Sequence, residues 1–190
     1  MKLYTVQTID VLAQLYRDKI YFTDWSKCFY LQEKNGGIQY ENCYRWMLNK
    51  YNEKKKHDFS APLIWWTTAF EDSDEYFKRC TIPGAVFIKA EVPDKIVLLH
   101  LRDEWEMGPF SNFYLGWKGH RIFTSDLPWT EKEEELFDKL WNIYNKNQLA
   151  KEETWNEIFN ITKNSQQIEA VTPFIDLTWL INNKERGINE

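Results

Sequence analysis

Glycine and cysteine are scarce in this sequence, which limits the kinds of site that it can carry. Only seven of the 190 residues are glycine, and neither G-x-G-x-x-G nor a phosphate-loop pattern occurs. Phosphate binding by a glycine-rich loop is therefore not expected. The cysteines (Cys28, Cys43 and Cys80) have no C-x-x-C spacing, and because their number is odd they cannot form a complete disulfide framework, so reduced thiols in a cytosol are expected. The three histidines do not lie at ligand spacing with them, so we expect no metal site.

The sequence also lacks an excess of basic charge and a long apolar run. Lys and Arg number 24 against 29 Asp and Glu, a net charge of −5, which argues against a nucleic-acid partner. The basic residues at 50–57 have the composition of a solvated helix end. No stretch is long and apolar enough to span a bilayer, and the start MKLYTVQT lacks an apolar signal core. We therefore expect a soluble, cytoplasmic protein of bacterial or phage style, with no membrane partner.

Aromatic residues, in contrast, are abundant. The chain has 10 Trp, 10 Tyr and 12 Phe, which together make up 17% of the residues. Aromatic rings bury large areas and prefer offset or edge-to-face contacts. Such a surplus either builds a stiff core or lines a pocket in which rings stack. Core aromatics are the commoner case, so the core interpretation is favoured for most of these rings.

The pattern of apolar residues predicts strands mixed with helices. Strands are expected where apolar and β-branched residues alternate or run together, at residues 2–8, 61–70, 85–92, 95–101 and 166–175. Helices are expected where apolar residues recur at steps of three and four, at residues 8–16, 40–51, 74–80, 130–144, 151–159 and 176–187. The segments 85–92 and 95–101 are interpreted as adjacent strands. Together the elements predict an α+β fold. The predicted fold is a single domain of residues 1–190 with a mixed β-sheet core, flanking helices and a helical C-terminal portion at about 129–190.

Several short motifs occur in a recurring order. They are LYTVQT near the start, YRWM at Tyr44–Met47, PLIWW in the aromatic strand, EVPDKIVLLHLRDEW at residues 91–105 and TWNEIF at Thr154–Phe159. Together they resemble the bacterial family catalogued as domain of unknown function 3841, over nearly the whole chain. That family favours Asp-x-Trp after the VLL strand and an Asn further on, and Asp103, Trp105 and Asn112 take these places. His100-Leu101 stands where the family has Ser-Asp, and PLIWW departs from its Trp-x-Trp spacing. The family name implies no activity.

The polar turn after the apolar run KIVLLHL is the first candidate for a functional site. Strand side chains repeat every two residues, so Asp103 and Trp105 are expected to face the same side. There an acid beside an indole can hold a ring by stacking and a hydrogen bond. The alternative is that Asp103 caps a turn and Trp105 fills the core. His100 lies in an apolar run, and we interpret it as a hydrogen-bonded core or edge residue rather than as a base.

Other polar and aromatic residues complete the candidate site. Trp65 and Trp66 are expected on opposite faces of their strand, so one ring belongs to the core and the other lines a pocket or lies beneath a helix. Thr5 and Gln7 form a polar pair on the first strand that faces either the pocket or solvent. The long segment of residues 110–123 has the length of a binding loop. We therefore predict a ligand-binding site made of Thr5, Gln7, Trp65, Asp103, Trp105 and Asn112.

Two classes of function compete for this site. One is a binding module that grips a small planar or nucleotide-like ligand, or a protein partner, because Trp, Tyr and Arg are the usual anchors of such sites. The other is an NAD-using enzyme, because strand, short helix and second extended piece is also the opening order of ADP-ribosyltransferase-like folds. In those folds a His or Arg on the first strand grips NAD and a late Glu handles the ribose. Here Gln7 or Thr5 and Glu169 would take these places, which is an analogy of fold alone. The binding module is favoured because it requires no missing catalytic group, and the cofactor stays open, with NAD as one possibility.

Overall fold

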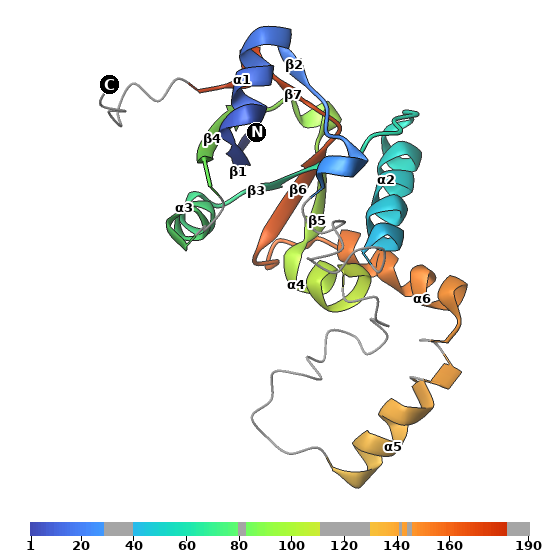
Figure 1. Cartoon of the computed structure of the whole chain (residues 1–190). Helices are drawn as coiled ribbons and strands as arrows, with labels where there is room; N and C mark the ends of the chain where they lie inside the picture. The colour runs from blue at the N-terminus through green and yellow to red at the C-terminus, as the bar shows by residue number, and fades with distance from the viewer. Residues whose placement is uncertain (29–39, 80–82, 111–129, 141, 144–145, 182–190) are drawn as a thin grey trace.

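The computed structural model describes residues 1–28, 40–79, 83–110, 130–140, 142–143 and 146–181 (Figure 1). The strands are β1 (Lys2–Thr8), β2 (Ile20–Tyr21), β3 (Ile64–Thr67), β4 (Ala85–Glu91), β5 (Leu98–Leu101), β6 (Ile168–Thr172) and β7 (Ile175–Asp176). The α-helices are α1 (Ile9–Asp18), α2 (Glu41–Lys55), α3 (Phe70–Arg79), α4 (Arg102–Trp105), α5 (Glu131–Leu140) and α6 (Gln148–Trp155). Short 3₁₀ turns lie at Trp25–Lys27, Asp94–Ile96, Asn156–Phe159 and Leu177–Trp179, and a π-helical turn at Glu106–Phe110.

Five strands form one sheet in the order β4-β1-β3-β6-β5. Each pairing in it is antiparallel. The α+β class is therefore confirmed, whereas the predicted mixed sheet is wrong. The consecutive strands β4 and β5 were expected side by side, but they lie at opposite edges. The cause is that β1 pairs with β4 along its whole length, while β6 lies between β3 and β5.

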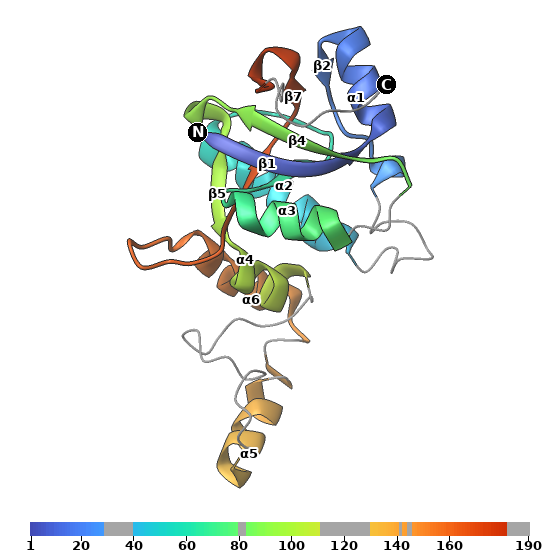
Figure 2. The same cartoon turned by 90° about the vertical axis from the view of Figure 1, so that its left-hand side faces the viewer.

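Apolar side chains cover both faces of this sheet. On one face, α1 and the two-stranded β2–β7 ribbon pack over Leu3 and Trp66. On the other face, α2 and α6 pack over Leu98 and Val171. Figure 2 shows α3 beneath β1 and β4, on the face to which Tyr4 presents its ring to Phe70 of α3 at 5.5 Å between centroids. The sheet is thus the middle layer, and each face has its own hydrophobic cluster.

The C-terminal portion is only partly helical. α5 projects away from the sheet in both views (Figures 1 and 2), and α6 runs into the 3₁₀ turn that ends at Phe159. β6 then returns to the sheet, as the pattern of residues 166–175 predicts. It lies between β3 and β5, a position that the pattern does not give, and β7 pairs with β2. The expected helical portion from 129 to 190 therefore stops at Phe159. Of the helix expected at 176–187, the described part forms only the 3₁₀ turn Leu177–Trp179.

Helix α2 follows the predicted stripe of apolar residues and carries much of the second cluster. Cys43, Met47 and Tyr51 recur every four residues and are buried. The Tyr51 hydroxyl donates a 2.7 Å hydrogen bond to the Ile96 carbonyl oxygen, which links α2 to the segment before β5. Burial raises the pKa of Tyr51 to about 12, so the hydroxyl stays a donor at neutral pH. This bond fixes the height of α2 over the sheet.

The end of α2 yields a test of local backbone strain. Lys56 caps the helix with φ 57° and ψ 48°, the left-handed conformation that favours glycine. We expect Lys56→Gly to raise the free energy of unfolding by roughly 0.5–1 kcal/mol, because the strain of a side chain in this conformation is removed. The same substitution at the exposed Lys54, inside the helix, is expected to lower it by about 1 kcal/mol. Urea denaturation of both variants checks the prediction, and a loss of stability in both would contradict it.

Candidate functional site

Two of the predicted site residues meet on the α2 face of the sheet. Trp65 on β3 and Trp105 at the end of α4 have ring centroids 4.5 Å apart. Trp66, the neighbour of Trp65, is 1% exposed and belongs to the cluster on the opposite face. The expectation that these two adjacent indoles point to opposite faces is therefore confirmed.

Thr5 and Gln7 are not brought to this place. Tyr4 pairs with Thr67, which shares the face of Trp65 because it lies two residues further along β3. Thr5 and Gln7 alternate with Tyr4 and so lie on the face that α1 covers. There the Gln7 side-chain amide donates to Thr5 Oγ1 at 3.0 Å, so the two form a polar pair as expected, but one separate from Trp65. Asn112 lies outside the described residues.

Asp103 and Trp105 also separate, because the chain becomes helical directly after β5. Arg102 donates its backbone N–H to the Gln167 carbonyl oxygen at 3.0 Å, and α4 begins at this residue. Two residues on a helix are about 200° apart around its axis, as follows from 3.6 residues per turn. Trp105 is therefore buried under α2 while Asp103, half-buried, lies in the first turn. The prediction that they face the same side is wrong.

Five rings, each from a different element, form what we call the aromatic cluster, made of Tyr44, Trp65, His100, Trp105 and Phe110. His100 on β5 meets Trp65 edge to face with centroids 5.0 Å apart. Tyr44 from α2 meets both indoles edge to face at 5.6 and 6.0 Å. Phe110 lies 6.3 Å from Trp105. Tyr44, Trp65 and Phe110 are only half-buried, so the aromatic cluster extends from the interior to the surface.

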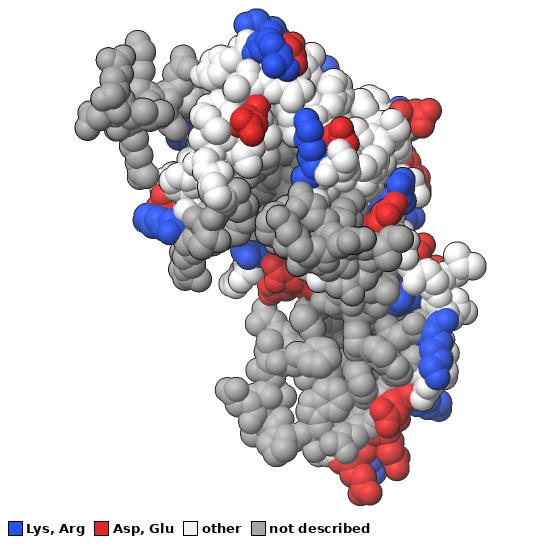
Figure 3. Space-filling model, viewed as in Figure 1, with Lys and Arg blue, Asp and Glu red and all other residues white. Residues whose placement is uncertain are grey.

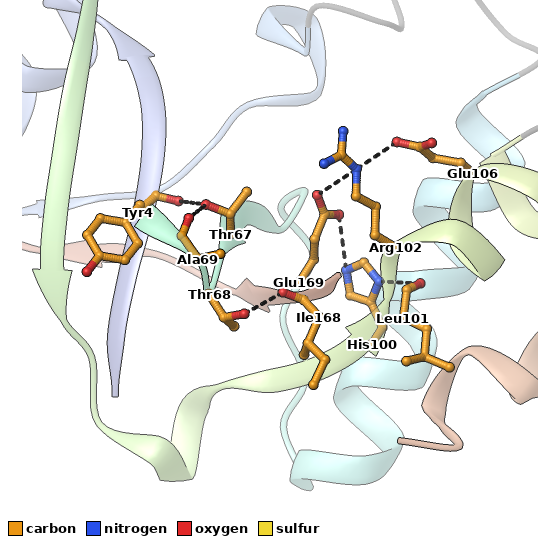
Figure 4. A network of polar contacts seen from close by, with 10 residues as sticks. All are labelled: Tyr4, Thr67, Thr68, Ala69, His100, Leu101, Arg102, Glu106, Ile168 and Glu169. Atoms are coloured by element: carbon orange, nitrogen blue, oxygen red, sulfur yellow. Dashed lines mark hydrogen bonds and ion pairs between the residues drawn. The ribbon is translucent and has the colours of Figure 1, made fainter. Parts of the chain in front are cut away.

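One side of the aromatic cluster is charged. His100 on β5 and Glu169 on β6 are directly opposite each other in the sheet, and His100 Nε2 lies 3.9 Å from Glu169 Oε2. Arg102 Nε lies 3.6 Å from Glu169 Oε1 and 3.0 Å from Glu106 Oε1. Figure 4 shows the Glu169 carboxylate between the imidazole and the guanidinium group. We call these four residues the polar edge.

His100 in the polar edge is held in its neutral form. Its side chain is 0% exposed, and this burial lowers its pKa to about 4, because a charged imidazolium is poorly solvated there. The hydrogen bond from Nδ1 to the Leu101 carbonyl oxygen at 3.3 Å raises the pKa, but by less than burial lowers it. At neutral pH His100 is therefore uncharged, with a proton on Nδ1 and a lone pair on Nε2.

Two buried polar atoms of the aromatic cluster lack a hydrogen bond within the described part of the chain. They are Trp65 Nε1 and His100 Nε2. Trp65 Nε1 can only donate, while the lone pair on His100 Nε2 accepts. A buried polar group without a partner destabilises a protein by about 1–3 kcal/mol. Such groups are rare in native structures, and both of these belong to one cluster.

Reasoning from the sequence found the indoles of this site but not its polar edge. His100 was expected to be a hydrogen-bonded residue of the apolar run, and its burial agrees with that. Glu169 was considered only as a late acid of an enzyme, and Arg102 was not considered. The pairing of β5 with β6 brings these residues together, and no local pattern predicts that pairing. A usable signal was the charged residue at the second position of the apolar strand IEAVT at 168–172.

Other chemistries find little support in the described residues. Burial raises the pKa of Cys28 to about 11 and that of Cys43 to about 12, so neither thiol forms the reactive thiolate at neutral pH. Among the described side chains, His, Cys, Asp and Glu nowhere gather in a group of three that could hold a metal ion. Figure 3 shows acidic and basic residues interspersed over the described part of this face rather than a continuous basic patch.

The comparisons with known proteins give a family. No described helix has the length and apolar character that crossing a membrane requires. Neither the curated proteins nor the solved structures contain a match. The family model described as Domain of unknown function (DUF3841) matches residues 2–182, as the order of short motifs predicts. The chain therefore belongs to this family.

Proposed function

We propose that this protein is a binding module that holds a small planar, nucleotide-like ligand at the aromatic cluster. The observation that carries the proposal is the pair of buried polar atoms, Trp65 Nε1 and His100 Nε2, that lack a hydrogen bond in the described chain beside stacked and edge-on rings. Small-ligand sites combine mostly apolar and aromatic walls with a few polar groups that orient the ligand. The aromatic cluster and the polar edge supply these two parts.

The arrangement of rings in the aromatic cluster favours a ligand with a planar ring over a ligand that is an extended chain. Trp65 and Tyr44 are half-buried and meet at 81° between their planes, 5.6 Å apart. A flat molecule that enters beside the exposed part of Trp65 gains both a stacking and an edge contact, each worth about 0.5–1.5 kcal/mol beyond its buried area. His100 and Glu169 then lie within reach of its polar substituents.

The described geometry favours the binding module over the NAD-using alternative. An ADP-ribosyltransferase-like site would require Gln7 or Thr5 to act together with Glu169. β1 presents these two side chains to the α1 face, whereas Glu169 lies on the α2 face, since it pairs with Thr67. A protein partner that inserts an aromatic side chain remains an outcome that the experiment below separates from a free ligand.

A thermal-shift experiment with nucleosides, nucleotides and NAD tests the proposal. A ligand present at about 100 times its Kd adds roughly 2.7 kcal/mol to the free energy of unfolding. For a chain of this length that raises Tm by about 5–10 °C. We expect a saturable rise with at least one compound that carries a planar base. No rise with any of them at millimolar concentration would contradict the proposal, and a partner protein that shifts Tm would then identify an interaction module.

A matched pair of variants locates the site. Trp65 and Trp179 are both half-buried tryptophans, but Trp179 packs against Phe174 in the cluster on the other face, with ring centroids 5.1 Å apart. Trp65→Ala is expected to abolish the ligand-dependent rise in Tm, and Trp179→Ala is expected to preserve it. If Trp179→Ala removed the rise and Trp65→Ala kept it, the ligand would bind on the α1 face instead.

A further inference from the structure

The hydrogen-bonding groups of the site restrict the chemistry of its ligand, and His100 is the first of them. A carbonyl oxygen only accepts hydrogen bonds, so the contact of 3.3 Å between Nδ1 and the Leu101 oxygen requires a proton on Nδ1. The neutral ring carries a single N–H. Nε2 is therefore an acceptor, and it lies on the side of the ring that faces Glu169 (Figure 4).

Glu169 is a second acceptor beside the first. Its Oε2 lies 3.9 Å from His100 Nε2, which is beyond hydrogen-bond distance. Two groups that both offer lone pairs repel at this separation, unless a donor lies between them. Arg102 approaches the other carboxylate oxygen, Oε1, at 3.6 Å, so the guanidinium group helps to orient the carboxylate. A ligand N–H that donates to His100 Nε2 also lies beside this carboxylate, whose negative charge favours a donor at that place.

Trp65 adds the opposite requirement. Its Nε1 is a buried donor without an acceptor in the described chain, and its ring contacts His100 with centroids 5.0 Å apart. An amine would donate to His100 Nε2 but leave Trp65 Nε1 without an acceptor. A carboxylate would accept from Trp65, but it cannot donate, and the charge of Glu169 repels it. The groups of the site match a donor and an acceptor that are adjacent on one planar edge.

We infer that the ligand carries an amide edge, an N–H beside a C=O, on a planar ring, with its carbonyl toward Trp65 and its N–H toward His100 and Glu169. A carboxamide on an aromatic ring and the lactam edge of a nucleobase both have this chemistry. The inference rests on the proposed function, because it names the ligand class of that same site.

A series of small probes tests the inference. Benzamide carries the complete edge, N,N-dimethylbenzamide keeps the carbonyl but has no N–H, benzoate has no donor and a negative charge, and toluene has only the ring. We expect benzamide to bind with a Kd in the millimolar range, measured by NMR titration, and each of the other three to bind at least tenfold more weakly. A buried site that forms hydrogen bonds with its ligand rejects analogues without those groups.

Protein variants distinguish binding through the amide edge of the ligand from binding through its aromatic ring alone. Trp65→Phe keeps an aromatic ring but removes the N–H, so we expect it to weaken benzamide about tenfold and to leave toluene unchanged. Trp179→Phe, the same change on the other face, is expected to alter neither, and circular dichroism of each variant confirms folding. If all four probes bind equally, or if benzoate binds best, the inference is overturned while the proposed function stands. If neither these probes nor the nucleosides bind, the proposed function itself fails.

Discussion

Replacing Trp66 by alanine is expected to lower the free energy of unfolding by about 4 kcal/mol. Trp66 lies on the central strand β3 and is 1% exposed. Its indole packs among Leu3, Ile88 and Ala170, and its Nε1 donates a 2.8 Å hydrogen bond to Thr172 Oγ1. The substitution opens a large cavity in the middle of the sheet and removes that donor. Because domains of this size have about 5–15 kcal/mol of stability in total, the variant should be only marginally folded.

The neighbouring Trp65 is the matched control for this effect. Trp65→Ala removes the same side chain from the adjacent position of the same strand, but its ring is half-buried and its Nε1 has no hydrogen bond within the described chain. We expect a smaller loss, about 2 kcal/mol. Urea denaturation with unchanged m-values measures both losses. An equal loss for the two variants would show that Trp65 is as much a part of the core as Trp66, and would weaken the case for a site on the α2 face.

The two tryptophans also show which features of a strand its sequence pattern can predict and which it cannot. Alternation along PLIWW predicts that the rings face opposite ways, because the period of a strand is two. The pattern does not indicate which ring is the core residue, since that depends on the helices that cover each face. α2 supplies Tyr44 to one face, and the α1 side supplies the close packing on the other.

Strand pairing is the part of the fold that the sequence did not predict. Consecutive segments joined by a short Pro-Asp link favour a side-by-side arrangement, because sequential strands are usually neighbours. β4 and β5 depart from this rule because β1 and β6, which lie far from them in sequence, occupy the positions next to them. The polar edge of the candidate site depends on this same non-local pairing, which is why His100 and Glu169 were not expected together.

The short helix α4 was missed for a local reason. The segment RDEW follows a buried strand, and three polar residues before one apolar residue form too short a pattern to distinguish an extended turn from one turn of helix. The acids Asp103 and Glu104 in the first turn of α4 are favourable near a helix N-terminus, and this signal supports the helix. Once the chain turns, Trp105 points into the aromatic cluster and Asp103 away from it.

Lowering the pH from 6.5 to 4 is expected to reduce the free energy of unfolding by about 3 kcal/mol through His100 alone. In the unfolded chain the pKa of this imidazole has its ordinary value of 6.5, whereas burial lowers the folded value to about 4. Between these two values the unfolded chain binds one more proton than the folded chain, so stability rises with pH in this window. The stabilisation is complete above pH 6.5 and is lost as the pH falls through 4.

The variant His100→Gln isolates this contribution, because glutamine fills a similar volume and does not titrate. Urea denaturation at several pH values between 4 and 7.5 gives the stability of both proteins, and the difference between the two curves cancels the titrating groups that do not interact with His100. We expect the wild-type protein to lose about 3 kcal/mol relative to the variant across the window. Glu169 lies 3.9 Å from the ring and favours the imidazolium, so the loss also measures which effect is larger, burial or this negative charge. Parallel stability curves for the two proteins would mean that His100 keeps its ordinary pKa in the folded protein. Its Nε2 would then not be an acceptor at all pH values in this window, and the inference of an amide-edge ligand would lose its main support.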